Sequence, residues 1–416
     1  MQKNISIVVA FLLLISYLSG NTFAISIQNG KTLYVGGDGP HNYTKIQNAI
    51  NDAEDGDTII VYPGVYYENI IIDKSVNIVG KNRYDTIIDG NYRGDVVKIM
   101  RGGVKLSGFT IRNSERSFER AGIVIHNSDQ VTIENNIITG NGDQGIRIFS
   151  SDYNIIRNNI ISNNTYYGIW LYNSKDNIIV NNSFLNDGLV LRDGNYKHFI
   201  QTIKNNTVNG KPLYYYNNME NFSIFGEAGQ IILVNCSHVN IKNLSVSNTS
   251  IALEIAYSSF INILNNNFTN NNLNGIRLYY SEKIEISSNL LNNNGWSGLS
   301  LWYSGNNSIY HNVISGNGYD SLEILFSSNR NKIFSNIIKD SPYGIGLRDS
   351  NDNMINFNNI YNHEKYGMIA QNSRVNARWN WWGSSFGIIF GDKIATQNGR
   401  IYFFPWLPFP NPFCGY

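Results

Sequence analysis

The sequence predicts an all-β protein, a right-handed parallel β-helix (a pectin-lyase-like solenoid) with three short strands in each rung of about 23 residues. The repeat is visible at Gly122, Gly145 and Gly168, which stand in the similar segments AGIVIHNS, QGIRIFSS and YGIWLYNS. The same phase returns at Gly229 and continues to Gly367. A constant period over so much of the chain is typical of a solenoid whose rungs stack on one another.

Each rung has the apolar pattern of strands. The first and third residues after the glycine are apolar, as in Ile123 and Ile125, while the residue between them varies. This alternation places one face of a strand inward. A serine, a second apolar group and an asparagine follow at fixed positions. The rungs have no 3.6-residue period and are rich in β-branched residues, which excludes helical and leucine-rich repeats.

One asparagine recurs about 14 residues after the rung glycine, usually before another apolar residue. Since stacked rungs place equivalent side chains about 4.8 Å apart, these amides can hydrogen-bond to the rungs above and below. The predicted ladder comprises Asn136, Asn159, Asn182, Asn266, Asn289 and Asn312. Asn243 occupies the same column and begins one of about ten glycosylation sequons, so we expect it to be buried and unmodified.

The chain divides by pattern into six segments. We expect a signal peptide at 1–24, an N-terminal cap with an amphipathic helix at 25–57, and a first β-helix run at 58–187. Residues 188–228 exceed the period and predict an excursion from the solenoid, where a specific site has room. A second run covers 229–376, and 377–416 forms an aromatic C-terminal cap.

The charge balance and the apolar segments of the chain narrow the classes of partner that it can bind. The 32 Lys+Arg balance 31 Asp+Glu, which gives no electrostatic case for nucleic acid or for an anionic membrane surface. The apolar run from Ile5 to Leu18 is shorter than the roughly 20 residues that span a bilayer, so we expect a mature chain without a transmembrane segment, secreted or held at the cell surface or in a periplasm. Cys236 and Cys414 are too few for a disulfide scaffold, although one bridge between them stays open.

Several stretches resemble the NosD-like β-helix proteins. The resemblance lies in TKIQNAINDAEDGDTIIVYPGVYYENIIIDKSVNIVGKN, TIIDG, VKLSGFTIRNS, VNGKPLYYY with AGQIILVNC, and NWWGSS, in the expected order. Such proteins are archaeal surface proteins and bacterial periplasmic relatives, and their repeats belong to a class named for carbohydrate-binding proteins and sugar hydrolases. The resemblance implies the β-helix fold, and the bacterial namesake implies an accessory role in assembling a copper enzyme.

The residues themselves predict no metal site and no cofactor. Copper favours clustered Cys, Met or His, but the six histidines occupy different rung positions and methionines are few. Only Cys236 and His238 are close in sequence.

Weak catalytic candidates stand in one outward column: Glu254, Arg277 and Glu323. We interpret Glu254 and Arg277 first as an ion pair on a solvated face, and an acid–base role is the alternative. Aromatic residues in neighbouring columns suit either sugar rings or stacking that stabilises the solenoid. As ligand-binding candidates we name Trp170, Tyr172, Tyr279, Trp302 and Tyr303.

The sequence therefore favours an exported, non-catalytic repeat protein that binds glycans or partner proteins along its long face. A polysaccharide lyase, epimerase or hydrolase is one alternative. A periplasmic accessory factor is the other.

Overall fold

The computed structural model describes residues 30–415, which form a parallel β-solenoid with five sheets. Every strand pair in this part of the chain is parallel except β21 with β22, so the predicted fold class is confirmed. Residues 1–29, which include the expected signal peptide and the start of the expected N-terminal cap, lie outside the described residues.

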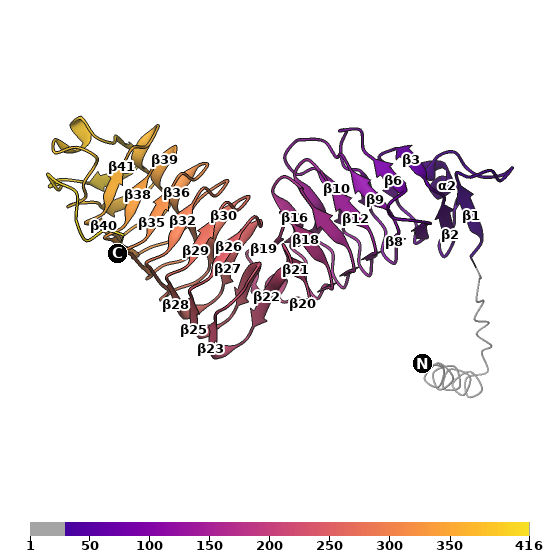
Figure 1. The fold of residues 1–416 in the computed structure, drawn as a ribbon, viewed down its shortest axis with the longest axis horizontal. Coiled ribbons are helices and arrows are strands. Elements are labelled where there is room, and N and C mark those ends of the chain that lie inside the picture. The colour runs from indigo at the N-terminus through magenta and orange to yellow at the C-terminus, as the bar shows by residue number, and fades with distance from the viewer. Residues whose placement is uncertain (1–29, 416) are drawn as a thin grey trace.

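The solenoid has two arms that meet at an angle near β19, β21 and β22 (Figure 1). The N-terminal arm, residues 30–208, has three sheets. Sheet 1 contains β1 (Thr32–Val35), β2 (Thr58–Val61), β5 (Asn77–Gly80), β8 (Lys105–Ser107), β11 (Thr132–Glu134), β14 (Ile155–Arg157), β17 (Ile178–Val180) and β20 (Thr202–Lys204). Sheet 2 contains β4 (Ile70–Ile72), β7 (Val97–Ile99), β10 (Ala121–His126), β13 (Gln144–Phe149), β16 (Tyr167–Tyr172) and β19 (Leu189–Arg192). Sheet 3 begins with β3 (Gly64–Tyr67), β6 (Thr86–Asp89), β9 (Thr110–Arg112), β12 (Ile137–Thr139), β15 (Ile160–Ser162), β18 (Ser183–Leu185) and β21 (Thr207–Val208).

The C-terminal arm, residues 211–415, continues sheet 3 and adds two sheets. Sheet 3 continues with β22 (Lys211–Asn217), β24 (Gln230–Val234), β27 (Ile251–Ala256), β30 (Asn274–Tyr279), β33 (Leu299–Trp302), β36 (Asp320–Leu325), β39 (Tyr343–Arg348), β42 (Tyr366–Gln371) and β44 (Ile394–Gln397). Sheet 4 contains β23 (Glu220–Ile224), β25 (Ser237–Lys242), β28 (Ser259–Leu264), β31 (Glu285–Ser287), β34 (Ser308–Tyr310), β37 (Lys332–Phe334), β40 (Asn353–Asn356), β43 (Arg374–Asn376) and β45 (Arg400–Tyr402). Sheet 5 contains β26 (Ser245–Ser247), β29 (Asn267–Thr269), β32 (Leu290–Asn292), β35 (Val313–Ser315), β38 (Ile337–Lys339) and β41 (Asn359–Tyr361).

The rung phase changes between the arms. The glycine-containing strand belongs to sheet 2 in the first arm, as in β16, but to sheet 3 in the second, as in β30. Residues 188–208 continue sheets 2, 1 and 3 through β19, β20 and β21, and the chain then reverses at the Asn209–Gly210 turn into β22. The expected excursion at 188–228 is therefore wrong, because the extra residues rotate the rung phase by one sheet.

The corners explain why the chain is rich in asparagine. Asn135, Asn158 and Asn181 adopt positive φ angles of 56°, 57° and 56°, a conformation that asparagine tolerates better than most residues. The next residue is then turned inward, where Asn136, Asn159 and Asn182 are at most 1% exposed. Each corner thus uses one asparagine to turn the chain and a second inside the solenoid.

The inward asparagines form hydrogen-bonded columns. The backbone N–H of Asn136 donates to Oδ1 of Asn159, and that of Asn159 to Oδ1 of Asn182, both at 3.0 Å. In the second arm the backbone N–H of Asn266, Asn289 and Asn312 donates in the same way to the next rung at 2.8–3.0 Å. These bonds satisfy buried backbone groups that no strand partner reaches.

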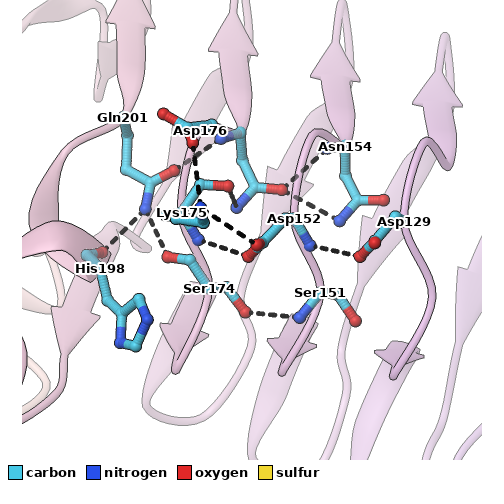
Figure 2. Close-up of polar contacts among 10 residues, drawn as sticks. Asp129, Ser151, Asp152, Asn154, Ser174, Lys175, Asp176, His198 and Gln201 are labelled. Atoms are coloured by element: carbon cyan, nitrogen blue, oxygen red, sulfur yellow. Dashed lines mark hydrogen bonds and ion pairs between the residues drawn. The ribbon is translucent and has the colours of Figure 1, made fainter.

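A second column of this kind has no counterpart in the sequence interpretation. The backbone N–H of Asn154 donates to Asn177, and that of Asn177 donates to Gln201. Figure 2 shows Asn154 and Gln201 among the residues around this column. The Gln201 amide then donates to the carbonyls of Ser174 and His198 at 2.7 and 2.8 Å. Gln201 ends the column because its longer side chain reaches across the last corner of the arm.

Asn243 differs from expectation. It is exposed, with a φ of 59°, and Leu244 takes the inward place by donating its backbone N–H to Asn266 Oδ1. The rung is one residue shorter here, with 22 residues between Leu244 and Asn266. The fixed spacing of 23 therefore selected the corner residue instead of the buried one, and the expectation of burial is wrong.

Both ends of the described solenoid carry caps. Helix α2 (Ile46–Asp52) buries Ile46, Ala49 and Ile50 against the first coil. At the far end Trp382 is fully buried, but Phe386, Phe404 and Phe409 are more than half exposed, so the aromatic plug is smaller than expected. The short helix η2 (Gly387–Ile389) lies in this cap. The tail after it runs back over the outer surface, where Asn411 and Asn359 exchange two hydrogen bonds of 2.8 and 3.0 Å.

Within residues 30–415, none of the helices has both the length and the apolar character needed to cross a membrane. Cys236 and Cys414 are both buried and free, so they form no bridge.

Candidate binding cleft at the junction of the arms

Strand β19 ends sheet 2 at the junction, and among residues 30–415 no further strand pairs with its outer edge. Side chains of the second arm take the place of that strand. The Gln230 amide donates to the carbonyl of Leu189 at 2.7 Å and accepts from its N–H at 2.9 Å. The N–H of Leu191 donates to Glu254, and the carbonyl of Leu191 accepts from Arg277 at 3.2 Å. Buried backbone groups that would otherwise be unpaired are satisfied in this way.

The Glu254–Arg277 pair is therefore an internal contact. The expectation of a solvated ion pair is wrong, because Glu254 is 0% and Arg277 5% exposed, with 2.6 Å between Arg277 Nη2 and Glu254 Oε1. Burial raises the pKa of the Glu254 carboxyl, and the Arg277 charge opposes the rise. A buried pair of this kind is costly to break by removing one partner. Both side chains hydrogen-bond to the backbone of Leu191 in β19, which argues for a structural role.

The five aromatic candidates have different surroundings. Trp170 and Tyr279 are each 6% exposed, so neither offers a ring face to a ligand. Trp170 packs with Val190, Ile251 and Leu273 in an apolar cluster between the arms. Tyr172, at the end of β16, and Tyr303, at a corner, are exposed, and Tyr303 stacks on Tyr280 with ring centroids 4.5 Å apart. Only Trp302 faces the cleft described next.

A cleft of 750 Å³ lies between the arms. Its walls come from the segments before β10, β13 and β16 and the end of β19 in the first arm. In the second arm they come from β30, β33 and β36 and from the segments before β30 and β33. The lining residues are Arg116, Ser117, Phe118, Gly140, Asn141, Gly142, Asp143, Asn163, Thr165, Tyr166, Tyr167, Arg192, Leu273, Asn274, Arg277, Trp296, Trp302 and Glu323. Tyr214–Tyr216, beside which the sequence interpretation placed room for a site, do not line it.

The two carboxyl groups that line the cleft, Glu323 and Asp143, differ in their hydrogen bonds and burial. Glu323 accepts hydrogen bonds from the Ser300 hydroxyl and from Trp302 Nε1, the latter at 3.2 Å. Asp143 is 1% exposed, and burial raises the pKa of its carboxyl to about 6. Its Oδ1 has no hydrogen-bond partner among the described residues. Glu323 therefore offers the cleft a carboxyl group that can accept a hydrogen bond from a ligand, whereas Asp143 Oδ1 is buried beneath the cleft surface.

An aromatic column leads out of the cleft along the second arm. Trp296, Tyr319, Tyr343 and Tyr366 follow one another in successive rungs, with ring centroids 5.4, 5.2 and 6.4 Å apart. Trp296 and Tyr319 are both 44% exposed. The sequence interpretation missed this column because Trp296 and Tyr319 lie two residues before their rung position and Tyr343 and Tyr366 one residue before theirs. A fixed offset does not select them together.

A second carboxyl lies beside Glu323. Asp320 is 5% exposed, and burial, reinforced by the Glu323 charge, raises the pKa of its carboxyl to about 8. Gly346 leaves the space that Asp320 uses, since a Cβ there would lie 3.0 Å from Asp320 Oδ1. The Asp320 carboxyl can therefore stay protonated near pH 7 beside Glu323.

The described residues do not fit a copper site. Among residues 30–415 no three His, Cys, Asp or Glu side chains gather as metal ligands. Cys236 is buried with its sulfur against the carbonyls of Tyr216 and Val234, whereas His238 is exposed and stacks on Phe260. The Cys236–His238 pair therefore does not form a shared site.

The fold and the cleft define a parallel β-solenoid protein with an aromatic-lined cleft at a break between two arms. The family model described as "Periplasmic copper-binding protein (NosD)" matches residues 50–223 and 215–394. The chain therefore belongs to the NosD family.

Other proteins are similar over shorter stretches or at lower identity. A "Cell surface glycoprotein" of Methanothermus fervidus is 33% identical over 130 residues, which are 30% of this chain and 20% of that protein. This chain thus matches about a fifth of its relative's length.

Solved structures with similar chains include an Azotobacter vinelandii mannuronan C-5 epimerase module, with 14% identity, a TM-score of 0.28 and coverage of 86% of this chain and 92% of that chain. An alginate lyase from Paenibacillus has 12% identity, a TM-score of 0.32 and coverage of 89% and 99%. A GH87 alpha-1,3-glucanase domain in complex with nigerose has 13% identity, a TM-score of 0.36 and coverage of 92% and 69%.

Proposed function

We propose that this chain is an exported, non-catalytic NosD-family solenoid that works at the cell surface or in a periplasm and binds a glycan in the junction cleft. One observation carries the proposal. The cleft opens onto the Trp296–Tyr319–Tyr343–Tyr366 column, so a chain of sugar rings has aromatic faces to stack on over several rungs. The expected location is supported by a family described as periplasmic and a relative described as a cell surface protein.

The test is a panel of soluble polysaccharides and oligosaccharides, scored for binding by calorimetry and for chain cleavage by size-exclusion chromatography. Trp296→Ala should weaken binding at least about tenfold, as expected for loss of an aromatic contact. Trp379→Ala is the matched control, because Trp379 is 43% exposed, close to the 44% of Trp296, but lies in the C-terminal cap. Tyr303→Ala tests the corner column instead. No binding to any glycan would contradict the proposal.

Catalysis is a second candidate function, favoured by the Asp320–Glu323 pair. Two neighbouring carboxyls, one of them able to stay protonated, are what general acid–base chemistry on a glycosidic bond uses. If the panel reveals cleavage, Glu323→Gln should abolish it while binding persists. Glu254→Ala is unsuitable for this purpose, because Glu254 supports β19. Cleavage lost in Glu323→Gln would replace the non-catalytic proposal with an enzymatic one.

A further inference from the structure

We infer that the glycan in the junction cleft carries an anionic substituent, a carboxylate or a sulfate ester, and that Arg192 binds it. This inference rests on the proposed function and names the ligand class of the same site.

Arg192 is the last residue of β19, where its backbone pairs with Tyr172. Its guanidinium lies over the Trp302 ring, 4.7 Å from the ring centroid, and lines the cleft. The backbone pairing and the ring together fix the position of the side chain. A guanidinium stacked by its face keeps its N–H groups at the edge, where they can bind both oxygens of a carboxylate or sulfate.

The charge of Arg192 is not neutralised within the described residues. It has no ion pair and no side-chain hydrogen bond there, whereas Arg277 is paired with Glu254 and Arg147 with Glu119. Arg116, another cleft residue, also has no carboxylate partner in the described part of the chain and lies over the Tyr92 ring at 5.5 Å. Two guanidinium groups in the cleft are therefore free to bind a ligand's negative charge.

Neighbouring groups complete the site. Tyr167 lines the same cleft, and burial raises the pKa of its hydroxyl, so this group keeps its proton and can donate a hydrogen bond to a ligand. The Glu323 carboxyl lies in the same cleft and can accept from sugar hydroxyls. The cleft thus offers guanidinium groups for an anionic substituent and hydrogen-bond acceptors for sugar hydroxyls, a combination that suits an acidic sugar.

The experiment compares matched polymers: polygalacturonate with its methyl ester, and dextran with carboxymethyl-dextran and dextran sulfate. The charged form of at least one pair should bind at least about tenfold more tightly than the neutral form. Arg192→Gln should remove this preference while binding to the neutral form persists. Arg192→Lys, which keeps the charge without the planar fork, should give an intermediate result. Arg330→Gln is the control, because Arg330 is exposed outside the cleft.

The outcomes are separable. Equal affinity for charged and neutral forms, or an unchanged preference in Arg192→Gln with a wild-type urea midpoint, would overturn the inference and leave the glycan proposal intact. If no polymer binds, the proposed function fails with it. A preference for the carboxylate or for the sulfate form identifies the anionic group.

Discussion

Asp187 provides a quantitative test of the junction. It occupies the end of an inward column in which Asn141 donates to Asn164 and Asn164 to Asp187, and it is 0% exposed. Its Oδ2 accepts from Asn164 Nδ2 at 2.8 Å, but its Oδ1 is buried without a partner. Burial raises the pKa of this carboxyl from 3.8 to about 7. An asparagine would fit the column better than an ionised aspartate.

The sign of the pH effect follows from the raised pKa. The folded protein holds the proton more tightly than the unfolded chain, so the stabilising contribution is complete below pH 3.8 and is lost as the pH rises through about 7. The difference between 3.8 and about 7 corresponds to a loss of about 4 kcal/mol above pH 7. Asp187→Asn should therefore raise the free energy of unfolding by up to about 4 kcal/mol at pH 8.5 and change it little at pH 4.

The amide group that Asp187→Asn introduces also has a hydrogen-bond acceptor at the right position. Asn164 Nδ2 contacts the carbonyl of Ile138, 26 residues earlier, and the same spacing from position 187 reaches the carbonyl of Ile161. The assay is urea unfolding at pH 4 and 8.5, followed by tryptophan fluorescence. Asp129→Asn is the control, since Asp129 is exposed and accepts a backbone N–H from the next rung at 2.8 Å. A variant that is destabilised at pH 8.5, or that gains equally at both pH values, would refute the reasoning.

Three further predictions concern stability and modification. Glu254→Ala should lower the free energy of unfolding by about 3 to 5 kcal/mol, since it leaves Arg277 buried without its partner. Urea unfolding measures this, and a loss below about 1 kcal/mol would indicate an exposed pair. Asn159→Ala should destabilise by about 1 to 3 kcal/mol, because the Asn136 N–H loses its acceptor. Asn158→Gly keeps the corner conformation and should change stability by less than about 0.5 kcal/mol, so equal losses in the two variants would contradict the column account. Asn243 should carry a glycan when the chain is made in a host that modifies sequons, and peptide mass mapping that finds it bare beside a modified Asn248 would contradict its exposure.

Periodicity predicted the repeated part of the fold well, because each rung repeats the same inward positions. Ile123 pairs with Ile146 and Ile146 with Ile169, in the register that the 23-residue spacing requires. The same method failed where the period changes. The rung that contains Asn243 is one residue shorter than 23, so Asn243 lies at a corner and not in the interior. The longer segment after Gly168 was interpreted as an excursion, although it continues the sheets.

The junction could not be predicted from one sequence, since it joins residues that the repeat places in separate rungs. Glu254 and Arg277 had the spacing of an exposed column, but the phase change brings β19 over them and buries both. Trp170 and Tyr279 were selected as ring faces and are buried, while Trp296 was not selected and lines the cleft. Burial in a solenoid depends on what covers a rung, which local alternation does not reveal.

The most direct measurement of the central claim is a crystal structure of the full chain with an oligosaccharide from the best-binding polymer. We expect the sugar rings in the junction cleft, against Tyr167 and Trp302, and continuing over Trp296 and Tyr319. An oligosaccharide bound instead along the corner column at Tyr280 and Tyr303, with the cleft empty, would contradict the account.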